Sequence, residues 1–285
     1  MTIQRISVLG AGTMGHGIAQ VAAQAGFRTT LYDIEQHLVD AGCGLVEANL
    51  DKGIAHGKVT VEAKAEALGN LSGTADLAVA ANADLIIEAI PERIELKRQV
   101  FGELDSMAPA DCILASNTSS LSIAEIAAAT GRRERVLGMH FFNPVHIMSL
   151  LEIVVHDHTS EATLESARDV AAAMGKTAIV VKDVPGFATS RLGIVLGLEA
   201  IRMVEQGVAS VEDIDTAMEL GYRHPMGPLK LTDLVGLDVR LGIAEYLHEK
   251  LGSEAFDPPA LLRQMVNEGK LGKKSGQGFY DWSEN

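Results

Sequence analysis

The chain has 285 residues, of which 47% are hydrophobic and 22% are charged, and its 38 acidic and 24 basic residues give a formal net charge of −14. This composition fits a globular protein of one large or two modest domains and gives poor support to disorder. An acidic chain with only 4% aromatic residues also lacks the basic patches and stacking surfaces of a nucleic-acid-binding protein.

Signals for membrane insertion and export are missing from the sequence. No run of eighteen apolar residues occurs, and Met1–Ile6 leads straight into a strand pattern, without the basic and apolar regions of a signal peptide. The two cysteines, Cys43 and Cys112, are far apart, which excludes a disulfide framework and a four-thiolate metal site. We expect a cytoplasmic protein with no metal that binds neither membranes nor nucleic acid.

Short β-branched, apolar segments alternate with helical patterns through the first 183 residues. This alternation predicts an α/β domain over residues 1–183, in which helices cover a parallel, doubly wound sheet of the Rossmann type. The expected strands are Ile6–Leu9, Thr29–Tyr32, Leu85–Glu88, Ile113–Ala115 and Val136–Met139.

Helix boundary signals lie between these strands. Pro91 is expected to open one helix, and Ser122 with Glu125 forms a capping box before another. Gly26 and Gly175 stand where helix ends favour a positive φ.

A glycine pattern typical of dinucleotide binding follows the first strand directly. Gly10 permits a tight turn, Gly12 lets the backbone approach a pyrophosphate, and Gly15 allows close packing of helix on strand. Thr13 and Met14 complete the turn at the head of a helix, whose N-terminal N–H groups favour negative charge. We therefore expect all five residues to bind the cofactor.

An acidic residue ends the second expected strand. Asp33 lies twenty-one residues after Gly12, where a carboxylate accepts hydrogen bonds from an adenosine ribose and repels a 2′-phosphate. This position favours NAD over NADP. Because FAD proteins share the same turn, the pattern alone leaves FAD open.

A polar segment with the residue types of acid–base catalysis follows. Ser119 stands after one strand, His140 closes another, and Glu152 is a lone carboxylate within a further expected strand, the apolar Leu150–Val155. A buried carboxylate needs a partner, and an imidazole on the adjacent strand would make a base oriented by an acid. The alternative is a core histidine with a strand-edge charge.

The pattern changes near residue 184, and the remainder predicts an all-α second domain over residues 184–285. Thr189–Gln206 is apolar nearly all round and ends at Gly207, which suggests a helix buried in a bundle or between subunits. Ser210 begins the next helix, and Gly272–Tyr280 contains too much glycine to be helical. We expect a homodimer formed through this domain.

Six motifs in order resemble the L-3-hydroxyacyl-CoA dehydrogenase family, across essentially the whole chain, and the length is similar to that of bacterial 3-hydroxybutyryl-CoA dehydrogenases. The motifs are Gly10-Ala-Gly-Thr-Met-Gly15, Ser116-Asn-Thr-Ser-Ser120, His140-Phe-Phe-Asn-Pro144, Asp183-Val-Pro-Gly-Phe187, His224-Pro-Met-Gly-Pro228 and Gly272-Lys-Lys-Ser-Gly-Gln-Gly-Phe-Tyr280.

The resemblance implies reversible, NAD-dependent oxidation of L-3-hydroxyacyl-CoA, with short-chain substrates such as 3-hydroxybutyryl-CoA, to 3-oxoacyl-CoA. It further implies that His140 is the general base, Glu152 its carboxylate partner and Ser119 a donor to the C3 oxygen of the substrate. Related sequences leave open a dehydrogenase of free hydroxy acids or sugar acids, and a non-catalytic NAD-binding relative such as a lens crystallin.

The resemblance also assigns ligand contacts. It implies that Asn143 lies near the nicotinamide, that Glu92 and Lys97 contact the dinucleotide, and that Lys274 reaches it from the second domain. Lys52 matches a position near CoA. As an alternative, each of these lysines is an ordinary solvated charge.

One position departs from the family pattern. The family reads Pro-Gly-Phe-x-x-Asn-Arg, whereas Pro185–Arg191 places Ser190 where the asparagine joins the active-site network. Serine keeps a donor and an acceptor but is shorter and lacks the second amide donor. We expect Ser190 to join this network directly or through water.

Overall fold

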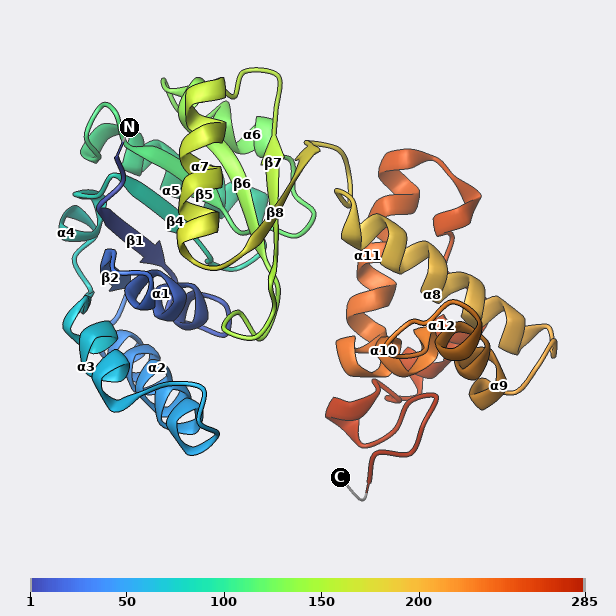
Figure 1. Ribbon diagram of the computed structural model, residues 1–285. Coiled ribbons are helices and arrows are strands. Elements are labelled where there is room, and N and C mark those ends of the chain that lie inside the picture. The colour runs from blue at the N-terminus through green and yellow to red at the C-terminus, as the bar shows by residue number, and fades with distance from the viewer. Residues whose placement is uncertain (1, 284–285) are drawn as a thin grey trace. The chain divides into compact units, whose positions relative to one another are not determined.

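The computed structural model describes residues 2–283 and divides into two compact units, one through Val184 and one from Pro185 (Figure 1). The first unit holds the expected doubly wound α/β sheet and the second is helical, so the predicted fold class is confirmed. Within residues 2–283, no helix is both long and apolar enough to cross a bilayer.

An eight-stranded sheet with the order β3-β2-β1-β4-β5-β6-β7-β8 organises the first unit. All pairs are parallel except β6 with β7, so the expectation of a wholly parallel sheet is wrong for this pair. The strands are β1 (Arg5–Leu9), β2 (Arg28–Tyr32), β3 (Leu71–Thr74), β4 (Leu85–Glu88), β5 (Ile113–Ser116), β6 (Val136–Phe141), β7 (Leu150–Val155) and β8 (Thr177–Lys182).

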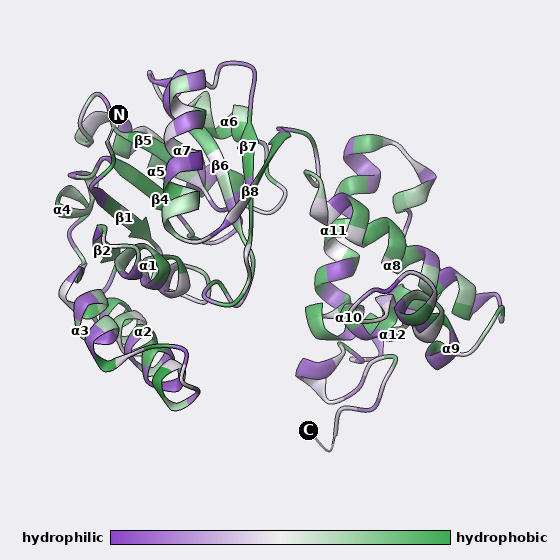
Figure 2. Cartoon of the chain, in the orientation of Figure 1, coloured by the Kyte–Doolittle hydropathy of each residue, from purple (hydrophilic) through white to green (hydrophobic). Residues whose placement is uncertain are grey.

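The sequence prediction missed two strands, and both lie at edges of the sheet. β3 contains Gly73 and is short, and β8 is only partly buried. Edge strands have weaker hydrophobic patterns than central ones, because only one side pairs and each face is partly exposed. The central strands β1 and β4 are hydrophobic throughout most of their length (Figure 2).

Helices cover both faces of the sheet (Figure 1). Ile18 and Ala22 of α1 and Leu164 and Val170 of α7 share one apolar core with the strands. The helices of the first unit are α1 (Gly15–Gln24), α2 (Gln36–Ala55), α3 (Val61–Gly69), α4 (Leu77–Ala81), α5 (Ile94–Met107), α6 (Ile123–Ala127) and α7 (Glu161–Ala173).

Most of the boundary signals act as expected. The Ser122 hydroxyl caps α6 by accepting from the Glu125 N–H at 3.3 Å, and Gly26 and Gly175 have positive φ. Pro91 does not open a helix: α5 begins at Ile94, and Pro91 lies in the turn before it. A proline suits this turn because its missing N–H leaves no donor to satisfy.

The second unit is a bundle of short helices with its own core, built around Ile194, Leu198, Leu237 and Leu247. Within this unit α8 is not buried all round, because Leu192 is 68% exposed while Ile194 is buried. Gly272–Tyr280 contains only one short 3₁₀ turn. The helices are α8 (Thr189–Glu205), α9 (Val211–Thr216), α10 (Pro228–Val235), α11 (Leu237–Leu251) and α12 (Ala260–Asn267).

Candidate active site

The glycine turn lies where the strand order reverses, between the carboxyl ends of β1 and β4, which is the usual ligand position in doubly wound sheets. Gly10 has φ +95°, and a Cβ on Gly15 would lie 1.6 Å from the Gly10 carbonyl oxygen. A Cβ on Gly12 would meet nothing within 4 Å. Two of the glycines therefore allow the tight turn, and the third faces open space in which a pyrophosphate fits.

A cavity of about 710 Å³ opens over this turn. Asp33 lines it and is tied to the turn, because its carboxylate accepts from the Ala11 N–H and the Ile34 N–H, each at 2.8 Å. Its lining fits the apolar body and hydroxyl groups of an adenosine. The lining residues include Gly10, Gly12, Thr13, Met14, Tyr32, Asp33, Ile34, Leu38, Ala89 and Ile90.

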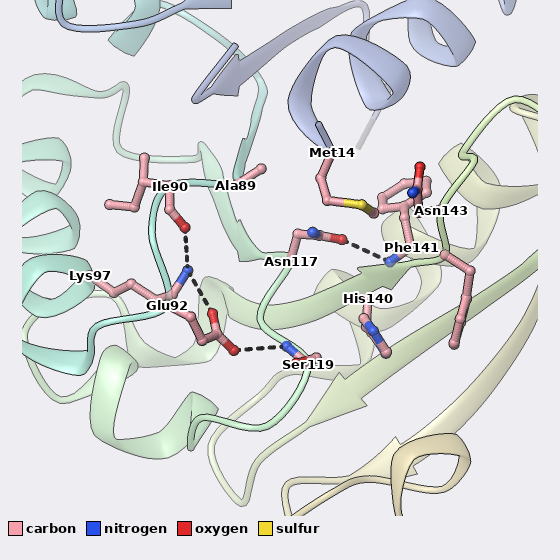
Figure 3. Close-up of a pocket in the computed structure, with 11 residues that line it drawn as sticks. Met14, Ala89, Ile90, Glu92, Lys97, Asn117, Ser119, His140, Phe141 and Asn143 are labelled. Carbon is pink, nitrogen blue, oxygen red and sulfur yellow. Dashed lines mark hydrogen bonds and ion pairs between the residues drawn. The ribbon is translucent and has the colours of Figure 1, made fainter. Parts of the chain in front are cut away.

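A second cavity of about 370 Å³ adjoins the first, since Met14, Ala89 and Ile90 line both. It gathers six residues that the sequence analysis placed in the site: Met14, Glu92, Lys97, Ser119, His140 and Asn143. Five of them stand at or after the carboxyl ends of β1, β4, β5 and β6, which meet at one edge of the sheet, and Lys97 reaches the cavity from α5 (Figure 3). The two adjoining cavities suit the two halves of a dinucleotide.

His140 and Glu152 form a pair across two antiparallel strands. They stand directly opposite one another in the register of β6 and β7, and Nδ1 of His140 lies 2.7 Å from Oε2 of Glu152. Glu152 is fully buried and His140 is nearly so. The alternative of a strand-edge charge is wrong for Glu152, because its carboxylate is in the interior and bonded to the imidazole.

The loop between β5 and α6 brings Ser119 beside the strand that carries His140 (Figure 3). The side chain of Asn117 accepts from the Phe141 N–H at 2.8 Å. Glu92 accepts from the Thr118 hydroxyl at 2.5 Å and from the Ser119 N–H at 3.1 Å. Glu92 therefore holds the serine loop from within the cavity.

A buried ion pair lies beneath this arrangement. The Lys97 ammonium, 1% exposed, contacts Glu88 at 2.5 Å, the Ile90 carbonyl at 3.2 Å and Glu92 at 3.3 Å. Glu88 is fully buried and also accepts from the Ser116 hydroxyl at 2.6 Å. Burial raises the pKa of Glu88, and the Lys97 charge opposes this shift.

Lys97 is thus not a solvated lysine, so that alternative is wrong here. No role was predicted for Glu88, although its carboxylate ends the buried apolar strand Leu85–Glu88, and a carboxylate in an apolar strand was the signal that singled out Glu152.

Among the described residues, three that were expected in the site line neither of these two cavities. Lys52 is exposed on α2 and belongs to neither cavity lining in the described part of the chain. Ser190, in the first turn of α8, and Lys274 lie in the second unit. The Lys274 ammonium contacts the Asp238 carboxylate at 2.5 Å. The roles expected for these three residues stay predictions.

The fold and the site define an NAD-dependent oxidoreductase with a histidine beside the nucleotide cavity. Comparison of the sequence with known families makes the class specific. "3-hydroxyacyl-CoA dehydrogenase, NAD binding domain" matches residues 5–184, and "3-hydroxyacyl-CoA dehydrogenase, C-terminal domain" matches residues 186–282. The chain belongs to the 3-hydroxyacyl-CoA dehydrogenase family.

Individual relatives agree with this assignment. The chain is 47% identical to a probable 3-hydroxybutyryl-CoA dehydrogenase of Bacillus subtilis, over 100% of this chain and 99% of the relative. It is similar to the crystal structure of FadB2 from M. tuberculosis, with a TM-score of 0.95 and 44% identity, and to that of (S)-3-hydroxybutyryl-CoA dehydrogenase PaaH1 from Ralstonia eutropha, with a TM-score of 0.95 and 39% identity. Each comparison covers 99% of both chains.

The buried ion pair of Glu88 and Lys97 gives the first prediction. Glu88→Gln keeps the shape of the side chain but removes its charge, which leaves the Lys97 ammonium buried beside Glu92 alone. Breaking a buried pair in this way costs about 3 kcal/mol of unfolding free energy. The double variant Glu88→Gln/Lys97→Met buries no such charge, so we expect it to regain most of that loss in chemical denaturation.

Lys270→Met is the matched control, because Lys270 pairs with Glu268 at the surface, and it should leave the denaturation midpoint nearly unchanged. If the double variant loses as much unfolding free energy as Glu88→Gln and Lys97→Met lose together when measured singly, the two side chains act independently.

Proposed function

We propose that this protein catalyses the reversible, NAD-dependent oxidation of L-3-hydroxyacyl-CoA to 3-oxoacyl-CoA, with short-chain substrates such as 3-hydroxybutyryl-CoA. The observation that carries the proposal is the contact of His140 with Glu152 at the wall of the cavity that adjoins the nucleotide cavity. The names of the relatives from Bacillus subtilis and Ralstonia eutropha support the substrate class.

His140 acts as the general base in this proposal. A bound nicotinamide would supply the acceptor for the hydride that leaves C3 of the substrate. Glu152 accepts a hydrogen bond from Nδ1 of His140, which leaves Nε2 as the nitrogen that removes the alcohol proton. The buried carboxylate then stabilises the imidazolium that forms, and Ser119 donates to the C3 oxygen of the substrate.

Other residues of the first unit hold the dinucleotide. The glycine turn with Thr13 and Met14 takes the pyrophosphate, Asp33 takes the adenosine ribose and favours NAD over NADP, and Asn143 takes the nicotinamide end. This assignment is supported by the two cavity linings, which contain Gly10, Gly12, Thr13, Met14, Asp33 and Asn143. Gly15 lines neither cavity and packs against the Gly10 backbone.

Glu92 and Lys97 have different proposed roles at the dinucleotide. Glu92 keeps 40% of its side chain exposed and can still accept from a ribose hydroxyl. The Lys97 ammonium lies within 3.3 Å of three acceptors of the chain itself, on Glu88, Ile90 and Glu92. We therefore assign Lys97 the task of holding Glu92 and supplying positive charge, in place of a direct hydrogen bond to the ligand.

Lys52 and Lys274 are proposed as ligand contacts on the family resemblance. Lys52 is exposed on α2 and available to the CoA portion. Lys274 would exchange its contact with Asp238 for the dinucleotide.

A reducing cytoplasm is proposed as the location. Both cysteines are free thiols, and burial raises the pKa of the Cys112 thiol to about 12. Free thiols persist in a reducing compartment such as the cytoplasm, where disulfide bonds are not favoured.

The second prediction tests the proposed reaction. His140→Gln should abolish reduction of acetoacetyl-CoA by NADH while leaving NADH affinity nearly intact, because the base lies outside the glycine turn. Steady-state rates and NADH fluorescence measure the two effects. Turnover within about tenfold of wild type, about 1.4 kcal/mol of barrier, would overturn the general-base role.

A matched control is His156→Gln. His156 is as buried as His140, at 7% exposure, but its Nε2 contacts the Arg133 carbonyl, so its loss should affect stability and spare turnover. Longer 3-oxoacyl-CoA thioesters and free 3-oxo acids belong in the same assay. A wild-type preference for a free acid would favour the hydroxy-acid alternative, and no turnover of any substrate would favour the non-catalytic one.

The third prediction concerns Ser190. If this position joins the hydrogen-bond network around the substrate oxygen, Ser190→Asn should be tolerated with equal or improved activity on acetoacetyl-CoA. The reason is reach, because an amide extends further than a hydroxyl and carries donors and an acceptor together. Steady-state kinetics with Ser190→Ala alongside measure whether the hydroxyl matters.

Two results would contradict this assignment. A loss of more than about a hundredfold in Ser190→Asn, about 2.7 kcal/mol, would show that the pocket is built around the smaller side chain. Kinetics close to wild type in both variants, across chain lengths, would show that Ser190 has no catalytic role.

The fourth prediction is the oligomeric state. We propose a homodimer formed through the second unit, because apolar side chains of packed helices remain exposed there: Leu192 of α8 at 68%, and Leu231, Leu234 and Val235 of α10 at 40–42%. Exposed apolar surface of this kind favours a partner. Light scattering at micromolar concentration should give twice the chain mass of 30.2 kDa.

Leu192→Arg should shift the mass toward the monomer. Val61→Arg, at an equally exposed valine of the first unit (64%), should not. A wild-type monomer would overturn the dimer, and a dimer that survives Leu192→Arg would place the interface elsewhere.

A further inference from the structure

Ser119 stands on an irregular loop, residues 117–122, between β5 and α6. A catalytic group on a loop needs support from its surroundings, because the loop backbone makes few ladder or helix hydrogen bonds of its own. The contacts described above, from Glu92 and Phe141, hold the first half of this loop. In the second half, the N–H groups of Ser120 and Leu121 donate to the Thr118 hydroxyl, at 3.3 Å and 2.9 Å. Ser122, at the distal end, takes its support from elsewhere in the chain.

A carboxylate from a distant part of the chain provides that support. Asp183 accepts from the Ser122 hydroxyl at 2.9 Å, from the Ile123 N–H at 3.0 Å and from the Ala124 N–H at 2.7 Å. It thereby satisfies the N–H groups of the first turn of α6, which a helix cannot satisfy by itself.

Asp183 is well placed to act as an anchor. Its own N–H donates to the Val155 carbonyl at 2.9 Å, so its backbone is fixed to the end of β7, beside β8. The helix that it caps, α6, has only five residues, and a helix this short depends on tertiary contacts for its stability. The position of α6, and with it the end of the Ser119 loop, therefore depends on this carboxylate.

Asp183 also has a particular place along the chain. It stands directly before Val184 and Pro185, where the first unit ends and the second begins, and shortly before Ser190. The same residue thus fixes the end of the Ser119 loop and the start of the segment that leads to Ser190.

We propose that Asp183 is a positioning residue for the dehydrogenase reaction, which holds the Ser119 loop at its distal end through Ser122 and α6. The inference rests on the proposed role of Ser119 as the donor to the substrate oxygen. Because a donor displaced by about 1 Å can lose about a hundredfold in rate, removal of the anchor lowers kcat more than it weakens cofactor binding.

Asp183→Ala tests the proposal against Asp84→Ala. Asp84 is a matched control because its carboxylate also accepts two backbone N–H groups, those of Gln4 and Arg5 at 2.9 Å, together with the Arg5 guanidinium. It lies at the start of β4, the opposite end of that strand from Glu88. Both variants should lose stability, which thermal denaturation measures, and only Asp183→Ala should lower kcat for acetoacetyl-CoA, by tenfold or more, with the Kd of NADH within about twofold.

A double-mutant cycle with Ser119→Ala separates positioning from general destabilisation. In the Ser119→Ala background, Asp183→Ala should lower kcat no further than Asp84→Ala does, because the group that it positions is gone. An undiminished additional loss would overturn the proposal, and so would equal kcat values for Asp183→Ala and Asp84→Ala in the wild-type background.

Two milder variants keep the test decisive if Asp183→Ala does not fold. Asp183→Asn retains one carbonyl acceptor and Ser122→Ala removes one of the three bonds, so both should give kcat values between wild type and the tenfold loss. Unchanged kcat in both would overturn the proposal. If Ser119→Ala itself keeps the wild-type kcat, the proposed role of Ser119 is wrong, and this inference is wrong with it. If Ser119→Ala is slow but Asp183→Asn and Ser122→Ala each keep the wild-type kcat, only the inference about Asp183 is overturned.

Discussion

The buried carboxylate of Glu88 is the constraint around which the site is arranged. A carboxylate with no exposed surface has to find donors within the protein, and Glu88 takes them from three segments: the Lys97 ammonium on α5, the Ser116 hydroxyl at the end of β5, and the Ile90 N–H of its own turn. These bonds fix the ends of two neighbouring strands relative to one helix. Lys97 then extends the arrangement to Glu92, which holds the Ser119 loop.

The net negative charge of the chain opposes the binding of anionic ligands at this site. The chain carries a formal charge of −14, and both the dinucleotide and CoA are anionic, so long-range forces oppose binding. The carboxylates of the site are accordingly engaged by local donors: Glu88 by Lys97, Glu152 by His140, and Asp33 by the N–H groups of Ala11 and Ile34. The start of α1, behind the glycine turn, then offers N–H groups to the phosphates.

Local patterns predicted the features that depend on local sequence. The glycine turn and the central strands were readable because each needs a fixed residue type at a fixed spacing, and the pairing of His140 with Glu152 followed from one lone acid in an apolar strand. The direction of β7 was also available, since residues 142–149 are too few for a parallel crossover. The edge strands β3 and β8 carry no comparable pattern.

The contacts that sequence reasoning missed are those between segments distant along the chain. The motifs containing Glu88 and Asp183 were readable, but nothing local says that Glu88 accepts from Ser116 on the neighbouring strand or that Asp183 caps α6, because both contacts depend on how the strands are ordered. The two halves of the site differ for the same reason. His140 and Glu152 stand on paired strands whose ladder fixes their spacing, whereas Ser119 stands on a loop and takes its position from Glu92 on one side. In this site the strand ladder sets the spacing of His140 and Glu152, whereas the Ser119 loop depends on side-chain carboxylates for its position.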